Sequence, residues 1–223
     1  MRISSYLQVG RGITALIGGG GKTTLMYMLA EELKSHGKVI ICTSTKIRQP
    51  TQYLTLFDAK PQDITAAFAE HDVLCVADRT GEDKLCAPRT SFAQLARLAD
   101  FVIVEADGAK CLPLKAHAPH EPVIPEHTQR TIMVVGIDGI GKTIDEGCHR
   151  PALYAALAGV GEDTVVTPEI AASVIRAEGY GDRVYINKVE DAASYAAAQQ
   201  LGKLLTCPVV IGSLHMGVYT CLH

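Results

Sequence analysis

The strongest constraint on the fold comes from short, nearly unbroken apolar segments that recur along the chain. They lie at residues 13–17, 39–42, 73–77, 101–105, 131–135, 184–186 and 208–211. Most are continuous rather than alternating, which is typical of parallel strands covered on both faces. The pattern therefore predicts buried strands in a mostly parallel sheet.

Helical patterns occupy the stretches between these segments. Helices are expected at residues 23–36, 91–99, 151–158, 168–177 and 190–205. The first carries an apolar stripe from Leu25 to Leu33, and Gly37 follows as a natural stop. Strands that alternate with helices form βαβ units, so we expect an α/β fold with three layers, a mostly parallel sheet flanked by helices.

Length and composition favour one domain spanning residues 1–223. The chain is 48% hydrophobic and 20% charged, as in ordinary globular proteins. Its net charge of -3 favours neither nucleic acid nor an anionic membrane as a partner. No apolar run approaches the roughly 20 residues that cross a bilayer. The first residues, MRISSYLQVGRG, lack the apolar core of a secretory signal, so we expect a cytoplasmic protein.

A glycine-rich loop joins the first apolar segment to the first predicted helix. It consists of Gly18, Gly19, Gly20, Gly21, Lys22, Thr23 and Thr24. A helix that begins at such a loop binds phosphates through its free N–H groups and its positive dipole end. We expect the glycines to let backbone amides approach the phosphates and Lys22 to reach the β- and γ-phosphates. Thr23 would then bind Mg²⁺ and Thr24 the α-phosphate. This predicts a P-loop NTPase-like fold that binds a nucleoside triphosphate.

A second glycine-rich sequence, at 136–143, matches the strict GxxxxGK[ST] pattern, whereas the first has Leu16 in place of the leading glycine. A phosphate loop needs a helix that begins at its lysine. Lys142 is instead followed by IDEGCHRP, and the helical pattern resumes only at Pro151. We therefore predict that Lys22, and not Lys142, binds phosphate.

Two acids end the apolar segment at 101–105. Glu105 and Asp107 are expected at the carboxyl edge of the sheet, pointing to the same side. With Lys22 they are the candidate catalytic residues, and with Thr23 they are the candidate Mg²⁺ ligands. The alternative is a solvated strand end. Asp138 is a weaker third acid.

Two further segments follow strands. Asn187, Lys188 and Glu190 form a sequence close to NKxD, which binds guanine, so GTP is favoured over ATP. The longer side chain of Glu190 departs from that pattern. Thr43 to Lys46 either approach the γ-phosphate or form a simple turn.

The segment at 108–130 is irregular, with four prolines and three histidines. His117 and His120 suggest either a metal site or solvated loop histidines. His149 and Arg150, farther along, would hold an anion or join two elements.

The order of GGGGKTT, EADGAKCLPLKAHAPHEPVIP, VVGIDGIGK, CHRPALYAALAG and INKVED resembles the YqeC-type selenium-dependent hydroxylase accessory proteins, from about residue 10 to 212. This resemblance implies a role in maturation of a selenium-dependent molybdenum hydroxylase or its cofactor, and the hydroxylase as a partner. Similarity to related P-loop NTPases implies a homodimer.

The resemblance leaves the reaction open. It matches Lys115, His117, His120, His149 and Arg150 to family motif positions without assigning roles, and a second-substrate or cofactor pocket is one hypothesis for them. The leading interpretation is an NTPase that hydrolyses GTP or ATP. The alternatives are a slowly hydrolysing carrier switch for a metal or cofactor, and a small-molecule kinase or ligase.

Overall fold

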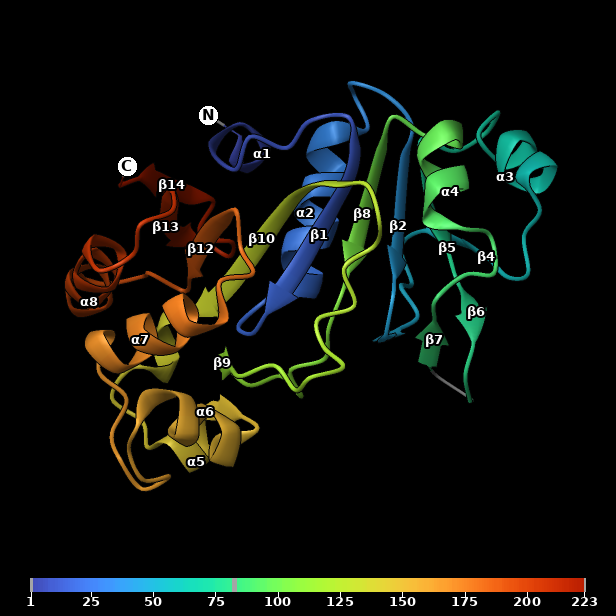
Figure 1. Ribbon diagram of the computed structural model, residues 1–223. Coiled ribbons are helices and arrows are strands. Elements are labelled where there is room, and N and C mark those ends of the chain that lie inside the picture. Colours follow the sequence, from blue (N-terminus) through green and yellow to red (C-terminus); the bar gives the residue numbers. More distant parts are fainter. Residues whose placement is uncertain (1, 82–83, 223) are drawn as a thin grey trace.

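A nine-stranded sheet lies at the centre of the computed structural model, which describes residues 2–81 and 84–222 (Figure 1). In spatial order its strands are β14 (Val218–Cys221), β13 (Val209–Ser213), β12 (Arg183–Asn187), β10 (Thr128–Gly136), β1 (Gly12–Gly18), β8 (Phe101–Glu105), β2 (Val39–Thr43), β5 (Val73–Val76) and β4 (Leu54–Leu56). Every neighbouring pair is parallel except β13 and β14. All seven expected strands lie in this sheet, which confirms the α/β fold class.

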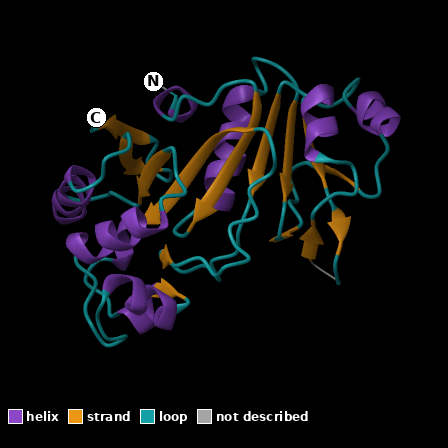
Figure 2. Ribbon diagram, viewed as in Figure 1, coloured by secondary structure: helices purple, strands orange, loops and turns teal. Residues whose placement is uncertain are grey.

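The carboxyl ends of the central strands meet at one edge of the sheet, where the arrowheads in Figure 2 point. Strand β1 lies between β8 and β10. The chain leaves β1 toward β2 on one side, and it leaves β8 toward β10 on the other. Ligand sites in open α/β sheets lie at such reversals of direction.

Helices cover both faces of the sheet. They are α1 (Ile3–Tyr6), α2 (Lys22–Leu33), α3 (Pro61–Ala67), α4 (Phe92–Leu98), α6 (Pro151–Ala158), α7 (Pro168–Glu178) and α8 (Ala192–Lys203). In β1, Leu16 packs in a cluster with residues of α1 and α2, whereas Ala15 and Ile17 pack in a cluster with residues of α6, α7 and α8. Alternate residues of a strand point to opposite faces, so the sheet is the middle of three layers.

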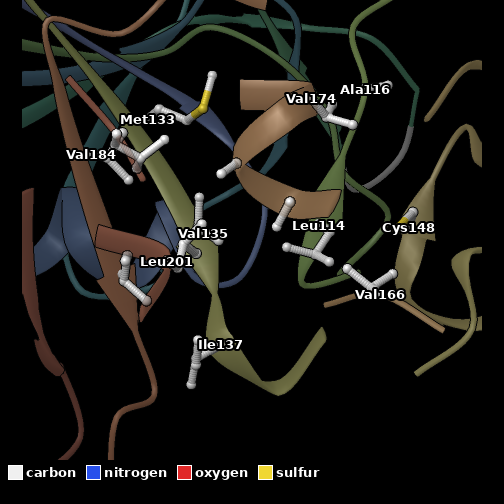
Figure 3. Close-up of a cluster of buried hydrophobic side chains, with 14 of the residues drawn as sticks. Leu114, Ala116, Met133, Val135, Ile137, Cys148, Val166, Val174, Val184 and Leu201 are labelled. Atoms are coloured by element: carbon white, nitrogen blue, oxygen red, sulfur yellow. The ribbon is translucent and has the colours of Figure 1, made fainter. Parts of the chain in front are cut away.

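Figure 3 shows the cluster on the second of these faces. Met133 and Val135 of β10 and Val184 of β12 lie on the sheet side of the cluster, and Val174 of α7 and Leu201 of α8 lie on the helix side. Burying one such side chain contributes about 1.5–3 kcal/mol to stability. The helices on this face are therefore held to the sheet mainly by burial of apolar side chains.

Local signals explain where the predicted helices begin. Ser91 caps α4 by accepting a hydrogen bond from the amide of Gln94, and Thr167 caps α7 by accepting one from the amide of Ile170. Asp191 caps α8 in the same way. Compared with the expected ranges, α4 is one residue shorter at each end, α8 is two residues shorter at each end, and α7 ends one residue later. These differences are within the usual uncertainty of helix boundaries.

The irregular segment is shorter than expected. Strand β10 begins at Thr128, so the segment ends at residue 127. Within it, β9 (Leu114–Lys115) pairs in parallel with β11 (Cys148–His149). A separate antiparallel sheet of β3 (Lys46–Arg48), β7 (Lys84–Cys86) and β6 (Asp78–Arg79) was not predicted, because such short strands leave no periodic pattern to detect.

Membrane-spanning helices, metal-binding groups and buried cysteines can be assessed over the described residues. Across residues 2–81 and 84–222, no helix has the length and apolar character needed to cross a bilayer. The same residues contain no group of three or more histidine, cysteine or acidic side chains arranged to hold a metal. Cys42, Cys75 and Cys148 are buried thiols.

The glycine loop packs against the backbone of neighbouring segments. A Cβ at Gly18 would lie 2.3 Å from the carbonyl oxygen of Val134, and one at Gly20 would lie 2.3 Å from the amide nitrogen of Gly136. A Cβ at Gly19 would lie 2.6 Å from the carbonyl oxygen of Leu112. Backbone atoms cannot move aside as a side-chain tip can, so these positions require glycine.

We expect the substitution Gly20→Ala to lower the free energy of unfolding by about 1–3 kcal/mol, because the added methyl group overpacks the loop and Gly20 has φ +76°. Gly10→Ala is the matched control, since a Cβ there meets nothing within 4 Å, and it should change stability by less than about 0.5 kcal/mol. Urea unfolding measures both. Equal stability of the two variants would contradict the packing argument.

Candidate functional site

The glycine loop carries the chain from β1 into α2, and Lys22 is the first residue of that helix. The amide of Gly18 donates to Asp107 Oδ2 (2.7 Å), that of Gly19 to the carbonyl of Val134 (2.9 Å) and that of Gly20 to the carbonyl of Leu112 (3.0 Å). This corrects the expected role of these three glycines, because their amides are already used within the protein. The amides of the first helical turn have no acceptor within the helix and remain the ones suited to an anion.

Lys22 is a buried cation at the centre of the site. Its side chain is 4% exposed, and its ammonium lies 2.8 Å from Asp107 Oδ1 and 4.0 Å from Glu105 Oε1. The ammonium also donates to the carbonyl oxygen of Gly18. The structure therefore brings together the three residues predicted to be catalytic.

Glu105 ends β8 beside the start of α2. Its Oε2 accepts a hydrogen bond from the hydroxyl of Thr23 (2.7 Å). The hydroxyl of Thr43 donates to the backbone oxygen of Glu105 at 2.8 Å, which ties β2 to this point. Burial raises the pKa of Glu105, although Lys22 and the Thr23 hydroxyl oppose the increase.

Asp107 lies two residues farther along and has the opposite electrostatic environment. Burial disfavours its charge, but the hydrogen bond with His117 and the charges of Lys22 and Lys115 outweigh burial and lower its pKa to about 2. Lys115 Nζ is 3.5 Å from Asp107 Oδ2. Asp107 is therefore an ionised acid that holds Lys22 and the start of the glycine loop.

His117 lies between two carboxylates. Its Nε2 is 2.5 Å from Asp107 Oδ2, and its Nδ1 is 2.9 Å from Oε2 of Glu178, the last residue of α7. Burial lowers the pKa of His117, but the two carboxylates outweigh burial and raise it. Both ring nitrogens are thus engaged by carboxylates, which argues against the metal alternative for His117. His120 is exposed.

A second group of charges extends from Lys115. Its ammonium donates to Glu121 Oε2 (2.7 Å) and to the carbonyl of Gly108 (2.6 Å). Arg150 NH2 lies 3.1 Å from the same oxygen of Glu121. Arg150 thus joins the irregular segment to the start of α6. Neither Glu121 nor Glu178 was among the predicted site residues, and an isolated acid far from the glycine loop carries no sequence signal for this role.

The segment expected to contact the base lies at the end of β12. Asn187 is buried; its Nδ2 donates to the carbonyl of Gly20 (2.8 Å), and its Oδ1 accepts from the amide of Leu214 (3.1 Å). Lys188 pairs with Asp138 at 2.8 Å. Glu190 accepts from the hydroxyl of Ser213 at 2.8 Å. Asn187 thus tethers the glycine loop, and Lys188 and Glu190 follow at the exposed edge.

The second glycine-rich sequence has no phosphate-loop geometry. The short η1 (Ile137–Gly139) follows β10, and the exposed Lys142 precedes α5 (Ile144–Gly147), which has only four residues. Lys46 is likewise exposed, in β3, with no ion-pair partner among the described residues. Of the two glycine-rich sequences, both within the described residues, the one at Lys22 has the strand–loop–helix geometry.

Comparison with known proteins identifies the family. The family model described as YqeC protein matches residues 14–152, more than half of the chain. The chain belongs to the YqeC family. The YqeC protein of Escherichia coli K12 is 31% identical over 172 residues, which cover 74% of this chain and 67% of that protein. The matched residues include the glycine loop, Glu105 and Asp107. They also include the charged group formed by Lys115, Glu121 and Arg150.

Among solved structures, a similar chain is the signal recognition particle 54 kDa protein from Aeropyrum pernix K1, in complex with GDP. The match has a TM-score of 0.46 and 16% sequence identity. It covers 96% of this YqeC-family chain but only 44% of that protein, so this chain spans less than half of its length.

The low pKa of Asp107 predicts how this family member responds to acid. Asp107 has a pKa of about 2, below the ordinary 3.8, so it contributes stability above pH 3.8 that is lost as the pH falls toward 2. The stability advantage of the wild type over Asp107→Asn should therefore shrink by about 2 kcal/mol between pH 4 and pH 2. Urea unfolding at both pH values measures it. A constant difference would show that Asp107 is not held ionised by its neighbours.

Proposed function

We propose that this protein binds a nucleoside triphosphate at the glycine loop, and that it uses or hydrolyses the γ-phosphate. The observation that carries the proposal is the position of Lys22. It begins a 12-residue helix directly after the buried strand β1, and two acids from β8 and its continuation face it. A helix terminus with a lysine and free first-turn amides is suited to a polyphosphate.

The phosphates would be held by the first turn of α2. We infer that the amides of Gly21, Lys22, Thr23 and Thr24 donate to phosphate oxygens, in place of the amides of Gly18 to Gly20. In an exchange of partners, the ammonium of Lys22 would contact the β- and γ-phosphates in place of Asp107. Asp107 keeps its charge balanced after that exchange, because His117 and Lys115 remain within 2.5 and 3.5 Å.

The same site suits Mg²⁺. Thr23 Oγ1 and Glu105 Oε2 are oxygen donors 2.7 Å apart beside the first turn of α2, and Mg²⁺ prefers oxygen ligands. A bound Mg²⁺ would neutralise charge on the β- and γ-phosphates. We infer that Thr23 and Glu105 hold the metal and its water, and that Glu105 orients the attacking water. Asp107, also expected as a ligand, is better placed to hold Lys22.

The family resemblance extends the proposal to a biological role. Proteins of this type are associated with the maturation of selenium-dependent molybdenum hydroxylases, so we propose that nucleotide use by this protein assists the maturation of such an enzyme or its cofactor. The activity would be that of an NTPase acting on GTP or ATP.

For the base, we favour guanine and expect Mg-GTP to bind more tightly than Mg-ATP. Glu190 follows Asn187 and Lys188 at the edge beside the glycine loop, where a carboxylate can accept two hydrogen bonds from guanine. Calorimetric titration with each nucleotide measures the preference. Glu190→Gln should reduce it, with the exposed Glu126→Gln as the control. Tighter binding of Mg-ATP to the wild type would contradict the guanine assignment.

The assignment of the phosphate lysine is tested by the same change at two lysines. Lys22→Gln should weaken Mg-triphosphate binding by about 100-fold, because a charge-assisted contact to phosphate is worth roughly 3 kcal/mol. Lys142→Gln should change the affinity by less than about twofold, because Lys142 lies outside the site. Calorimetry gives the affinities, and thermal melting shows whether each variant is folded. Loss of binding with Lys142→Gln alone would overturn the proposal.

A further inference from the structure

A cluster of basic side chains lies beside the nucleotide site, between the irregular segment and the start of α6. We refer to Lys110, Lys115, His149 and Arg150, together with Glu121, as the Arg150 cluster. The pairing of β9 with β11 brings its two parts together, since Lys115 is in register with His149. The amide of Ala116 donates to the carbonyl of His149 at 3.2 Å, which fixes the junction.

Arg150 is held in an unusual position. Its backbone has φ +65° and ψ +62°, a left-handed conformation rare for a residue other than glycine, immediately before α6. Its side chain is 30% exposed, and one terminal nitrogen is paired with Glu121. Its Nε is buried and has no hydrogen-bond partner among the described residues. Buried donors are nearly always paired, so an acceptor from outside the described residues, a water or a ligand, would complete the hydrogen bonding of this nitrogen.

The charges of the cluster are unbalanced. Lys110, Lys115 and Arg150 are three cations. Glu121 pairs with Lys115 and Arg150. Asp107 lies 3.5 Å from Lys115, but it is shared with Lys22 and His117. This excess of positive charge affects the pKa of His149. Burial and the charges of Lys115, Arg150 and Lys110 lower that pKa, and the charge of Glu121 only partly opposes them. A site with surplus positive charge favours a ligand group that carries more than one negative charge.

A continuous series of ion pairs joins the cluster to the glycine loop. Lys22 lies 2.8 Å from Asp107, Asp107 lies 3.5 Å from Lys115, and Lys115 lies 2.7 Å from Glu121. Glu121 then lies 3.1 Å from Arg150. Arg150 is therefore connected to Lys22 of the proposed triphosphate site through Asp107, Lys115 and Glu121.

We propose that Arg150, with His149, binds a phosphate group of a second substrate next to the nucleoside triphosphate. The presence of a first substrate, the nucleoside triphosphate, rests on the proposed function, but the anion site itself does not. A guanidinium offers adjacent N–H donors that match two oxygens of one phosphate, and the unpaired Nε of Arg150 is one of them. The excess charge favours a phosphate dianion over a carboxylate.

The experiment uses the His149 ring as a local reporter. The folded full chain, labelled with ¹³C at the histidine rings, is titrated with inorganic phosphate while the His149 signal is followed by NMR, with His149→Gln used to assign it. Phosphate should shift this signal and raise the pKa of His149, with a Kd of roughly 1 mM. Acetate, as the carboxylate probe, should bind at least about tenfold more weakly.

Two variants separate this site from the glycine loop. Arg150→Gln should weaken the phosphate response of His149 by at least about tenfold while nucleotide affinity stays within about twofold. Lys22→Gln should do the reverse. Arg150→Lys retains the charge that pairs with Glu121 but lacks Nε, so it should stay folded and still weaken the response by several-fold.

The outcomes distinguish the two proposals. If phosphate leaves His149 unchanged in the wild type, or if both Arg150 variants respond like the wild type, the anion site is overturned whatever the nucleotide results are. If acetate binds more tightly than phosphate, the phosphate assignment is wrong. If Lys22→Gln retains full nucleotide affinity, the proposed function fails while the test of the Arg150 cluster stands.

Discussion

The buried ion pair between Lys22 and Asp107 is the interaction on which the rest of the site depends. Each charge costs several kcal/mol to remove from water, so the pair is tolerated only because each partner has further contacts. Lys22 also donates to the carbonyl of Gly18, and Asp107 accepts from the amide of Gly18 and contacts His117 and Lys115. One pair of charges therefore fixes the end of β1, the start of α2 and the segment after β8.

The irregular segment that follows Asp107 owes its conformation to these charges. Its two basic groups, Lys115 and His117, both reach back to Asp107, and each carries a second acid, Glu121 or Glu178. A regular helix could not direct both side chains toward the same carboxylate, because residues two apart do not face each other on a helix. The segment has little regular secondary structure because its side chains are directed toward Asp107 and its neighbours.

Two acids separated by one residue carry opposite pKa shifts, and this divides their roles. Glu105 is mainly affected by burial, which raises its pKa and leaves it as the acid beside the Thr23 hydroxyl. Asp107 has cations on both sides, which lower its pKa. Groups in one site whose environments separate their pKa values usually perform different functions. Here Asp107 holds Lys22, whereas the role proposed for Glu105 is to hold a metal and its water.

Local sequence patterns predict the seven strands and a long helix that starts at the first glycine-rich loop rather than at the second, because apolar runs and helix starts are encoded locally. The sequence also places Glu105 and Asp107 together, since strand ends meet at one edge. The three-dimensional arrangement alone explains why Gly18 to Gly20 must be glycine, how Glu178 holds His117 across 61 residues of sequence, and what Arg150 contacts. Those features depend on groups far apart in the chain whose positions no local pattern encodes.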